Sequence, residues 1–118
     1  MIELYQAEWC PESRRIRQRL TELAIDYTIR QVPVDKTDRT ALVVKTGTDT
    51  IPALVTDDRQ VITTEEAIRA WLDQHYPEPD SADAHRAKAA KARRRDFERA
   101  RVEFASAGQP AAPLPAAS

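Results

Sequence analysis

The sequence feature that most constrains the fold is the point where a strand-like segment passes directly into a helical one. Residues Ile2–Ala7 alternate between apolar and polar side chains, as a strand with one buried face does. A helical pattern begins at Pro11, and proline favours the first helical position because its missing N–H has no partner there. Cys10, the only cysteine of the chain, lies at this junction. The sequence therefore predicts a β–α unit with a thiol at the start of its helix.

The position of Cys10 favours a reactive thiol. The free N–H groups of a helix's first turn carry partial positive charge that stabilises a thiolate, which is the nucleophilic form. Ser13 follows three residues on, on the same face of that turn, and can offer a hydroxyl. Residue type alone favours an inert buried cysteine, and the cap at Pro11 moves the interpretation towards catalysis. We predict Cys10 as the nucleophile and Ser13 as its hydrogen-bond donor.

The rest of the first 79 residues reads as alternating helices and strands. In chain order the predicted elements are a helix over 11–24, a strand over 27–34, a short helix over 38–46 that ends at Gly47, hairpin strands over 51–55 and 60–62, and a helix that starts at a capping box, Thr63–Glu66, and ends before Pro77. A βαβ start pairs its strands in parallel, whereas the closing hairpin is antiparallel. This order predicts an α/β fold with a mixed four-stranded sheet, β-α-β-α-β-β-α, followed by a C-terminal helix.

Charge divides the chain into an acidic body and a basic extension. Residues 1–79 hold 10 Lys/Arg against 14 Asp/Glu, and residues 80–118 hold 8 against 5. We predict three parts: a domain over 1–79, a basic Ala/Arg-rich helical extension over 80–107 and a disordered Pro/Ala-rich tail over 108–118. Acidic residues interrupt the basic face and no aromatic residues interleave with it, which disfavours a nucleic-acid partner.

Further features of the sequence bear on the surface of the first helix, on metal binding and on the cellular location. The arginines at 14, 15, 17 and 19 fall outside the apolar stripe of the first helix and are read mostly as solvated surface, with Arg14 adding positive potential near Cys10. Two histidines and one cysteine disfavour a metal site. The chain starts directly on a strand, without a basic-then-apolar leader, and has no apolar run of membrane-spanning length, so a cytoplasmic location is expected and no membrane partner.

Three motifs at the strand–helix junctions, Trp9–Ser13, Thr50–Pro52 and Thr64–Ile68, carry a family resemblance. In this order they make residues 1–79 resemble the glutaredoxins and the thioredoxin-like N-terminal domain of glutathione transferases. The resemblance implies a thioredoxin-like, glutaredoxin-type fold. It also implies a cis bond between Ile51 and Pro52, with the backbone of Ile51 pairing with the cysteinyl part of glutathione. The helix start at Thr64 and Glu65 would receive the γ-glutamyl group.

The sequence departs from the family pattern in ways that affect the chemistry. The second cysteine of a dithiol motif is Ser13 here, so the chemistry would be monothiol. Ala7 and Asp49 stand where a lysine and an arginine are common, and Thr64-Glu65 replaces a Glu-Ser pair. The ligand pocket is therefore expected to be less basic, and the co-substrate is predicted to be glutathione or another small thiol.

These features predict a monothiol glutaredoxin-like oxidoreductase that acts on mixed disulfides of proteins or small molecules. Cys10 and Ser13 would be catalytic, and Ile51, Pro52, Thr64 and Glu65 would bind the small thiol. Two alternatives stay open: a non-catalytic thioredoxin-like adaptor or iron–sulfur-binding module, and a transferase-like domain that conjugates the thiol to an electrophile. Fast alkylation of Cys10 would separate the enzymes from the adaptor.

Overall fold

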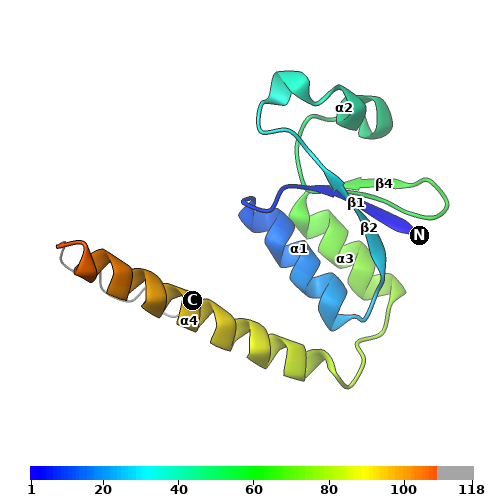
Figure 1. The fold of residues 1–118 in the computed structure, drawn as a ribbon. Coiled ribbons are helices and arrows are strands. Elements are labelled where there is room, and N and C mark those ends of the chain that lie inside the picture. The colour runs from blue at the N-terminus through cyan, green and yellow to red at the C-terminus, as the bar shows by residue number, and fades with distance from the viewer. Residues whose placement is uncertain (109–118) are drawn as a thin grey trace. The chain divides into compact units, whose positions relative to one another are not determined.

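A computed structural model describes residues 1–108 of the chain (Figure 1). Met1–Ala82 form one compact unit, and a second begins at Asp83. The elements of the structure are β1 (Ile2–Gln6), α1 (Pro11–Glu22), β2 (Tyr27–Gln31), a 3₁₀ turn (Lys36–Asp38), α2 (Thr40–Thr46), β3 (Ala53–Val55), β4 (Val61–Thr63), α3 (Glu65–His75) and α4 (Ala82–Ser106). The predicted tail over 108–118 lies outside the described residues except for Gly108, and the domain boundary at 79 stays a prediction.

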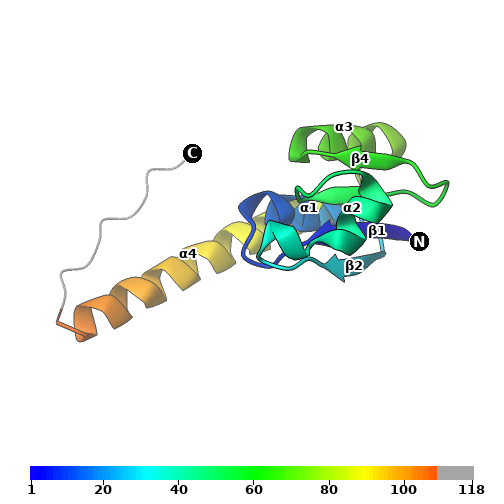
Figure 2. The same ribbon diagram turned by 90° about the horizontal axis from the view of Figure 1, so that it is seen from above.

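The four strands form one mixed sheet in the order β2-β1-β3-β4. β1 pairs in parallel with β2 and antiparallel with β3, and β3 pairs antiparallel with β4. Figure 2 shows β2 and β4 at the two opposite edges of this sheet. The predicted α/β class and strand pairing are thereby confirmed.

The main core lies between the sheet and the paired helices α1 and α3, which run side by side (Figure 1). Leu4 and Leu54 are paired across β1 and β3, so their side chains project from the same face of the sheet. The buried residues of this core are Ile2, Leu4, Ile16, Leu20, Leu23, Leu54, Ile68 and Leu72. A helical stripe on α1 and another on α3 thus cover one face of the strands.

A smaller core occupies the alternate strand positions. Leu42 of α2 clusters with Val32 and Ala53, and Tyr5 and Ile51 pack against them. Because Tyr5 and Ala53 neighbour Leu4 and Leu54 along their strands, they project from the opposite face. This cluster therefore attaches α2 and the start of β3 to the second face of the sheet.

The end of α2 agrees with its sequence prediction, whereas the start of α3 differs from its prediction by one residue. Gly47 ends α2 in the left-handed conformation, with φ 77° and its N–H donating to Val43 O at 2.8 Å, as predicted. The capping box on Thr63 is wrong by one residue, because Thr63 closes β4 and Thr64 caps α3. Thr64 Oγ1 accepts the N–H of Ala67 at 3.2 Å.

Arg19 corrects the expectation that the arginines of the first helix are solvated surface. Its side chain is only 9% exposed, and it donates to Asp73 at 2.8 Å, to Glu22 at 2.9 Å and to Glu78 at 2.8 Å. Burial alone would lower the pKa of Arg19, but the hydrogen bonds to Glu78, Asp73 and Glu22 outweigh it and raise that pKa. Arg19 therefore ties α1 to α3 and to the segment that follows α3.

The second unit contains the basic helix α4. Near its C-terminal end, Phe97, Ala100, Arg101 and Phe104 line a shallow hollow of about 200 Å³. Within residues 1–108, no helix combines the length and the apolar character that crossing a membrane requires.

We expect Arg19→Met to lower the free energy of unfolding by about 3–5 kcal/mol, because it removes the buried cation that the carboxylates of Glu22, Asp73 and Glu78 share. Urea denaturation followed by circular dichroism measures the change. The control is Arg14→Met, which removes an exposed arginine from the same helix and should cost no more than about 0.5 kcal/mol. Equal costs for the two variants would contradict a stabilising role of this ion network.

Candidate functional site

The register of the sheet brings the predicted site segments to one edge. Tyr5 near the end of β1 pairs with Ala53 at the start of β3, and Ala53 pairs with Thr63 at the end of β4. The chain after β1, the chain before β3 and the chain after β4 therefore all leave the sheet at the same edge. Those three connections hold Cys10, the Ile51–Pro52 pair and the Thr64–Glu65 pair, respectively.

Cys10 is the N-cap of α1, and Pro11 occupies the first helical position as predicted. The Cys10 residue is buried, with 5% of its surface exposed. Its Sγ accepts the backbone N–H of Ser13 at 3.4 Å, which satisfies one of the free donors of the first turn. The Cys10 thiol also donates to Glu12 Oε2 at 3.4 Å. The sulfur thus lies between a donor that stabilises its anion and an acceptor for its proton.

The structure gives Ser13 a different contact from the predicted one. The side chain of Ser13 is buried, with 0% of the residue exposed. Its backbone N–H reaches the sulfur, whereas its Oγ has no hydrogen-bond partner within residues 1–108. The contribution of Ser13 to Cys10 in this structure therefore comes from the peptide group and not from the hydroxyl.

A chain of charged contacts joins the starts of α1 and α3. Arg15 donates to both carboxylate oxygens of Glu65, at 2.6 and 2.9 Å, and its Nη2 lies 4.0 Å from Glu12 Oε1. The bond to Glu65 raises the pKa of Arg15, and the charges of Glu65, Glu12 and Cys10 add to that rise. The pKa of Glu12 is lowered by its own backbone N–H, then by the Cys10 thiol and by Arg15. Arg15 thus links the predicted nucleophile to the predicted ligand residue Glu65.

The sequence alone does not indicate this role of Arg15. Glu12 and Arg15 are three residues apart on one helix face, and that spacing could have indicated their own, longer contact at 4.0 Å. Glu65 is 50 residues further along the chain, so only the packing of α1 beside α3 reveals the bidentate pair.

Thr64 adopts a strained backbone at the start of α3. Its φ is 74°, an uncommon value for a β-branched residue. Strain of this kind persists where the surrounding structure enforces it, and it clusters at functional sites. The first turn of α3 also presents the free N–H groups common to every helix start. These features are compatible with the predicted carboxylate-binding role of Thr64 and Glu65.

The Ile51–Pro52 peptide bond is cis, as the family resemblance implied. The segment before it is held by Arg39, which is 5% exposed. Arg39 donates to the carbonyls of Pro33 at 2.8 Å, Val34 at 3.1 Å and Asp49 at 2.7 Å. One buried guanidinium therefore holds both ends of the connection that contains α2. Because Asp49 is one of its partners, Arg39 also helps to position the chain that leads into Ile51.

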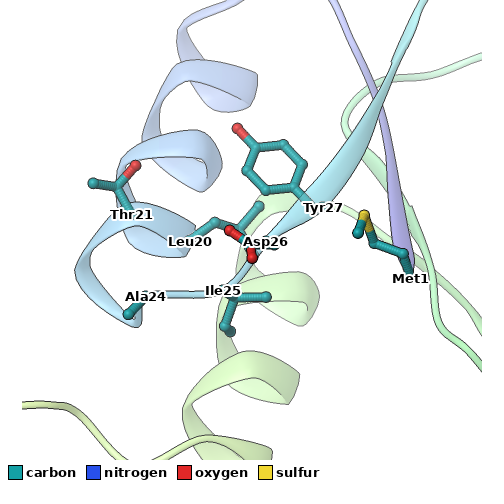
Figure 3. A pocket seen from close by; sticks show the side chains of 7 residues that line it. All are labelled: Met1, Leu20, Thr21, Ala24, Ile25, Asp26 and Tyr27. Carbon is teal, nitrogen blue, oxygen red and sulfur yellow. The ribbon is translucent and has the colours of Figure 1, made fainter.

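A larger hollow, of about 530 Å³, lies away from these residues (Figure 3). It is lined by Met1 and by residues around the C-terminal end of α1 and the start of β2, among them Leu20, Ile25 and Tyr27. Cys10 lies at the other end of α1. The hollow therefore does not belong to the candidate site.

Comparison with known proteins identifies relatives of the first unit. Residues 4–80 match the family described as glutathione S-transferase, N-terminal domain. A glutathione S-transferase structure from Rhodospirillum rubrum F11 is 30% identical, with a TM-score of 0.58 over 67% of this chain and 35% of that chain. A glutathione S-transferase domain-containing protein from Marinobacter aquaeolei VT8 is 27% identical, with a TM-score of 0.56 over 65% of this chain and 40% of that chain.

A glutathione transferase homologue from Sulfitobacter, solved with bound glutathione, shares the fold at 20% identity, with a TM-score of 0.59 over 74% of this chain and 46% of that chain. The chain thus spans less than half the length of each of these three structures. Among curated protein sequences, none matches significantly. The shared fold confirms the predicted thioredoxin-like class.

We expect Arg39→Met to loosen residues 33–50 without changing the environment of Cys10, because it leaves three carbonyl groups without their shared donor. Limited proteolysis with peptide mapping should show cleavage in this segment at least tenfold faster than in the unmodified protein, while alkylation of Cys10 stays within twofold.

The matched control is Lys36→Met, which removes an exposed cation from the same connection. Similar proteolysis of the Arg39 and Lys36 variants would show that Arg39 does not hold the segment.

Proposed function

Because this chain belongs to the family of glutathione S-transferase N-terminal domains, we propose that it binds a small thiol and exchanges it with disulfides through Cys10. The observation that carries the proposal is the placement of the Cys10 sulfur at the N-cap of α1, where it accepts the Ser13 N–H at 3.4 Å. A sulfur at this position is stabilised as an anion by the helix terminus, and the anion is the attacking species.

The proposed exchange takes place in two steps. The Cys10 thiolate attacks the small-thiol sulfur of a mixed disulfide, forms a new disulfide with it and expels the other thiol as a thiolate, which takes up a proton. A second small-thiol anion then attacks the small-thiol sulfur bound to Cys10, releases the small-thiol disulfide and restores the Cys10 thiolate. The substrate thiol is released in its reduced form, one free small thiol is consumed, and the small-thiol disulfide is the oxidised product.

Glu12 is placed to accept the proton of Cys10. Its Oε2 already receives the thiol hydrogen at 3.4 Å, and the hydrogen bonds from its own backbone N–H and from the Cys10 thiol lower its pKa. Glu12 is exposed, so it can pass the proton to solvent. We assign Glu12 as the proton acceptor that the sequence analysis did not name.

The small thiol is proposed to lie along the edge where the three connections meet. The backbone of Ile51, beside the cis Pro52, would pair with the ligand, and the start of α3 at Thr64 and Glu65 would receive its carboxylate. Glutathione is the first candidate, since the Sulfitobacter homologue was solved with it bound. Ala7 and Asp49 supply no positive charge, which keeps another small thiol as a candidate. A reducing cytoplasm would supply either thiol.

The family match favours a second candidate function, conjugation of the bound thiol to an electrophile. In that reaction the thiolate of the ligand, not of Cys10, is the nucleophile. The two functions therefore differ in whether Cys10 is indispensable.

The test compares glutathione-dependent reduction of a small mixed disulfide by the full chain and by Cys10→Ser. We expect the variant to lose at least 100-fold in rate, and intact-mass analysis to find glutathione disulfide-bonded to Cys10 in the unmodified protein. Activity that survives Cys10→Ser, or conjugation to an aromatic electrophile that does not need Cys10, would overturn the exchange mechanism in favour of the transferase.

Ser13 variants separate the peptide group from the hydroxyl. Ser13→Ala keeps the N–H that reaches the sulfur, so we expect less than a threefold loss in Cys10 alkylation rate at neutral pH. Ser13→Pro removes that N–H at a first-turn position that tolerates proline, and we expect more than a tenfold loss. Circular dichroism establishes that each variant is folded. A large loss in Ser13→Ala would instead assign the role to the hydroxyl.

A further inference from the structure

A separate cleft lies at the end of the sheet opposite Cys10. Its volume is about 280 Å³, and it is lined by Ile2, Thr56, Asp57, Asp58, Trp71, His75 and Tyr76. Ile2 starts β1, whereas Cys10 follows the end of that strand. His75 ends α3, whereas Thr64 caps its start. The cleft is therefore a separate place from the proposed thiol site, and neither the family match nor the proposed function accounts for it.

One wall of the cleft is aromatic and fixed in place. Trp71 and His75 stack with their ring centroids 4.3 Å apart, and Tyr76 meets Trp71 edge-on at 6.0 Å. His75 Nδ1 lies 2.8 Å from Trp71 O, and Trp71 and Tyr76 both pack against the main core. Aromatic faces carry negative charge density that attracts cations. These stacking and packing contacts arrange the aromatic faces before a ligand binds.

The rim of the cleft is acidic. Asp57 and Asp58 come from the turn between β3 and β4, and none of the residues that line the cleft is a lysine or an arginine. The carboxylate of Asp57 holds the α-ammonium group of Met1 at 2.6 Å. Asp58 accepts the hydroxyl of Thr56. One carboxylate of this rim therefore already holds an ammonium group, and the carboxylate of Asp58 forms no ion pair with a lysine or arginine of residues 1–108.

We propose that this cleft binds an arginine side chain of a partner protein. A planar guanidinium can stack on an aromatic wall and pair with a carboxylate at the same time, which a lysine ammonium does less well. The volume lies below the range of pockets that hold drug-sized ligands, so it suits one side chain rather than a folded segment. The aromatic wall, the acidic rim and the absence of lysine and arginine among the lining residues all favour a guanidinium group.

The test uses the fluorescence of Trp71 in the full chain. The chain has two tryptophans, so Trp9→Phe leaves Trp71 as the only one. Titration with N-acetyl-arginine amide is compared with N-acetyl-citrulline amide, which has nearly the same shape without the charge. We expect a saturable change with the arginine ligand at about 1–10 mM, and at least tenfold weaker binding of the citrulline ligand.

A rim variant completes the test. In the same background, Asp58→Asn should weaken arginine binding at least threefold, whereas Asp80→Asn, an exposed acid that does not line the cleft, should leave it unchanged. Equal binding of the arginine and citrulline ligands, or an Asp58→Asn protein that binds as tightly as its parent, would overturn the proposal. Since neither measurement involves Cys10, the outcome is independent of the thiol chemistry.

Discussion

The row of strand pairs from Tyr5 through Ala53 to Thr63 is the constraint on which the candidate site depends. It joins the end of β1, the start of β3 and the end of β4, so three connections that are distant in sequence leave the sheet side by side. A shift of one residue in either pairing would turn every side chain of the shifted strand to the other face. Leu54 would then lose its place in the main core. The hydrophobic pattern that builds the core therefore also fixes where Cys10 stands relative to Pro52.

Two buried arginines connect this sheet to its surroundings in different ways. Arg19 is neutralised by three carboxylates and ties α1 to α3. Arg39 is satisfied by three backbone carbonyls and holds an irregular connection. A buried charge is costly unless it is paired or fully hydrogen-bonded. Each arginine therefore favours the one arrangement that satisfies it. Arg19 favours the packing of α1 beside α3, and Arg39 favours the path of the chain before the cis proline.

The sequence was sufficient to predict the features that depend on local chemistry. The Cys10–Pro11 helix start, the Gly47 helix end and the mixed sheet follow from spacing and capping preferences, and the cis bond followed from the family resemblance. The role of Arg19 could not be predicted, because Asp73 and Glu78 lie more than 50 residues away. The bidentate pair of Arg15 with Glu65 could not be predicted for the same reason, since the two residues are 50 positions apart. Even the shift of the α3 cap from Thr63 to Thr64 reflects a tertiary effect, since pairing with Ala53 keeps Thr63 in β4.

The presence of a single cysteine determines what kind of chemistry the edge can support. A disulfide formed at Cys10 has no resolving thiol elsewhere in the chain, since Ser13 occupies the position of a dithiol motif's second cysteine. Turnover by exchange therefore requires a thiol from solution, and that thiol must be held in line with the sulfur for attack. Cys10 is buried, and its sulfur contacts the Ser13 N–H and Glu12. In the proposed reaction, the thiol approaches along the edge next to Ile51 and the start of α3. Because the proposed reaction needs an external thiol, it depends on the backbone of Ile51 and of the α3 start to position that thiol as well as on Cys10.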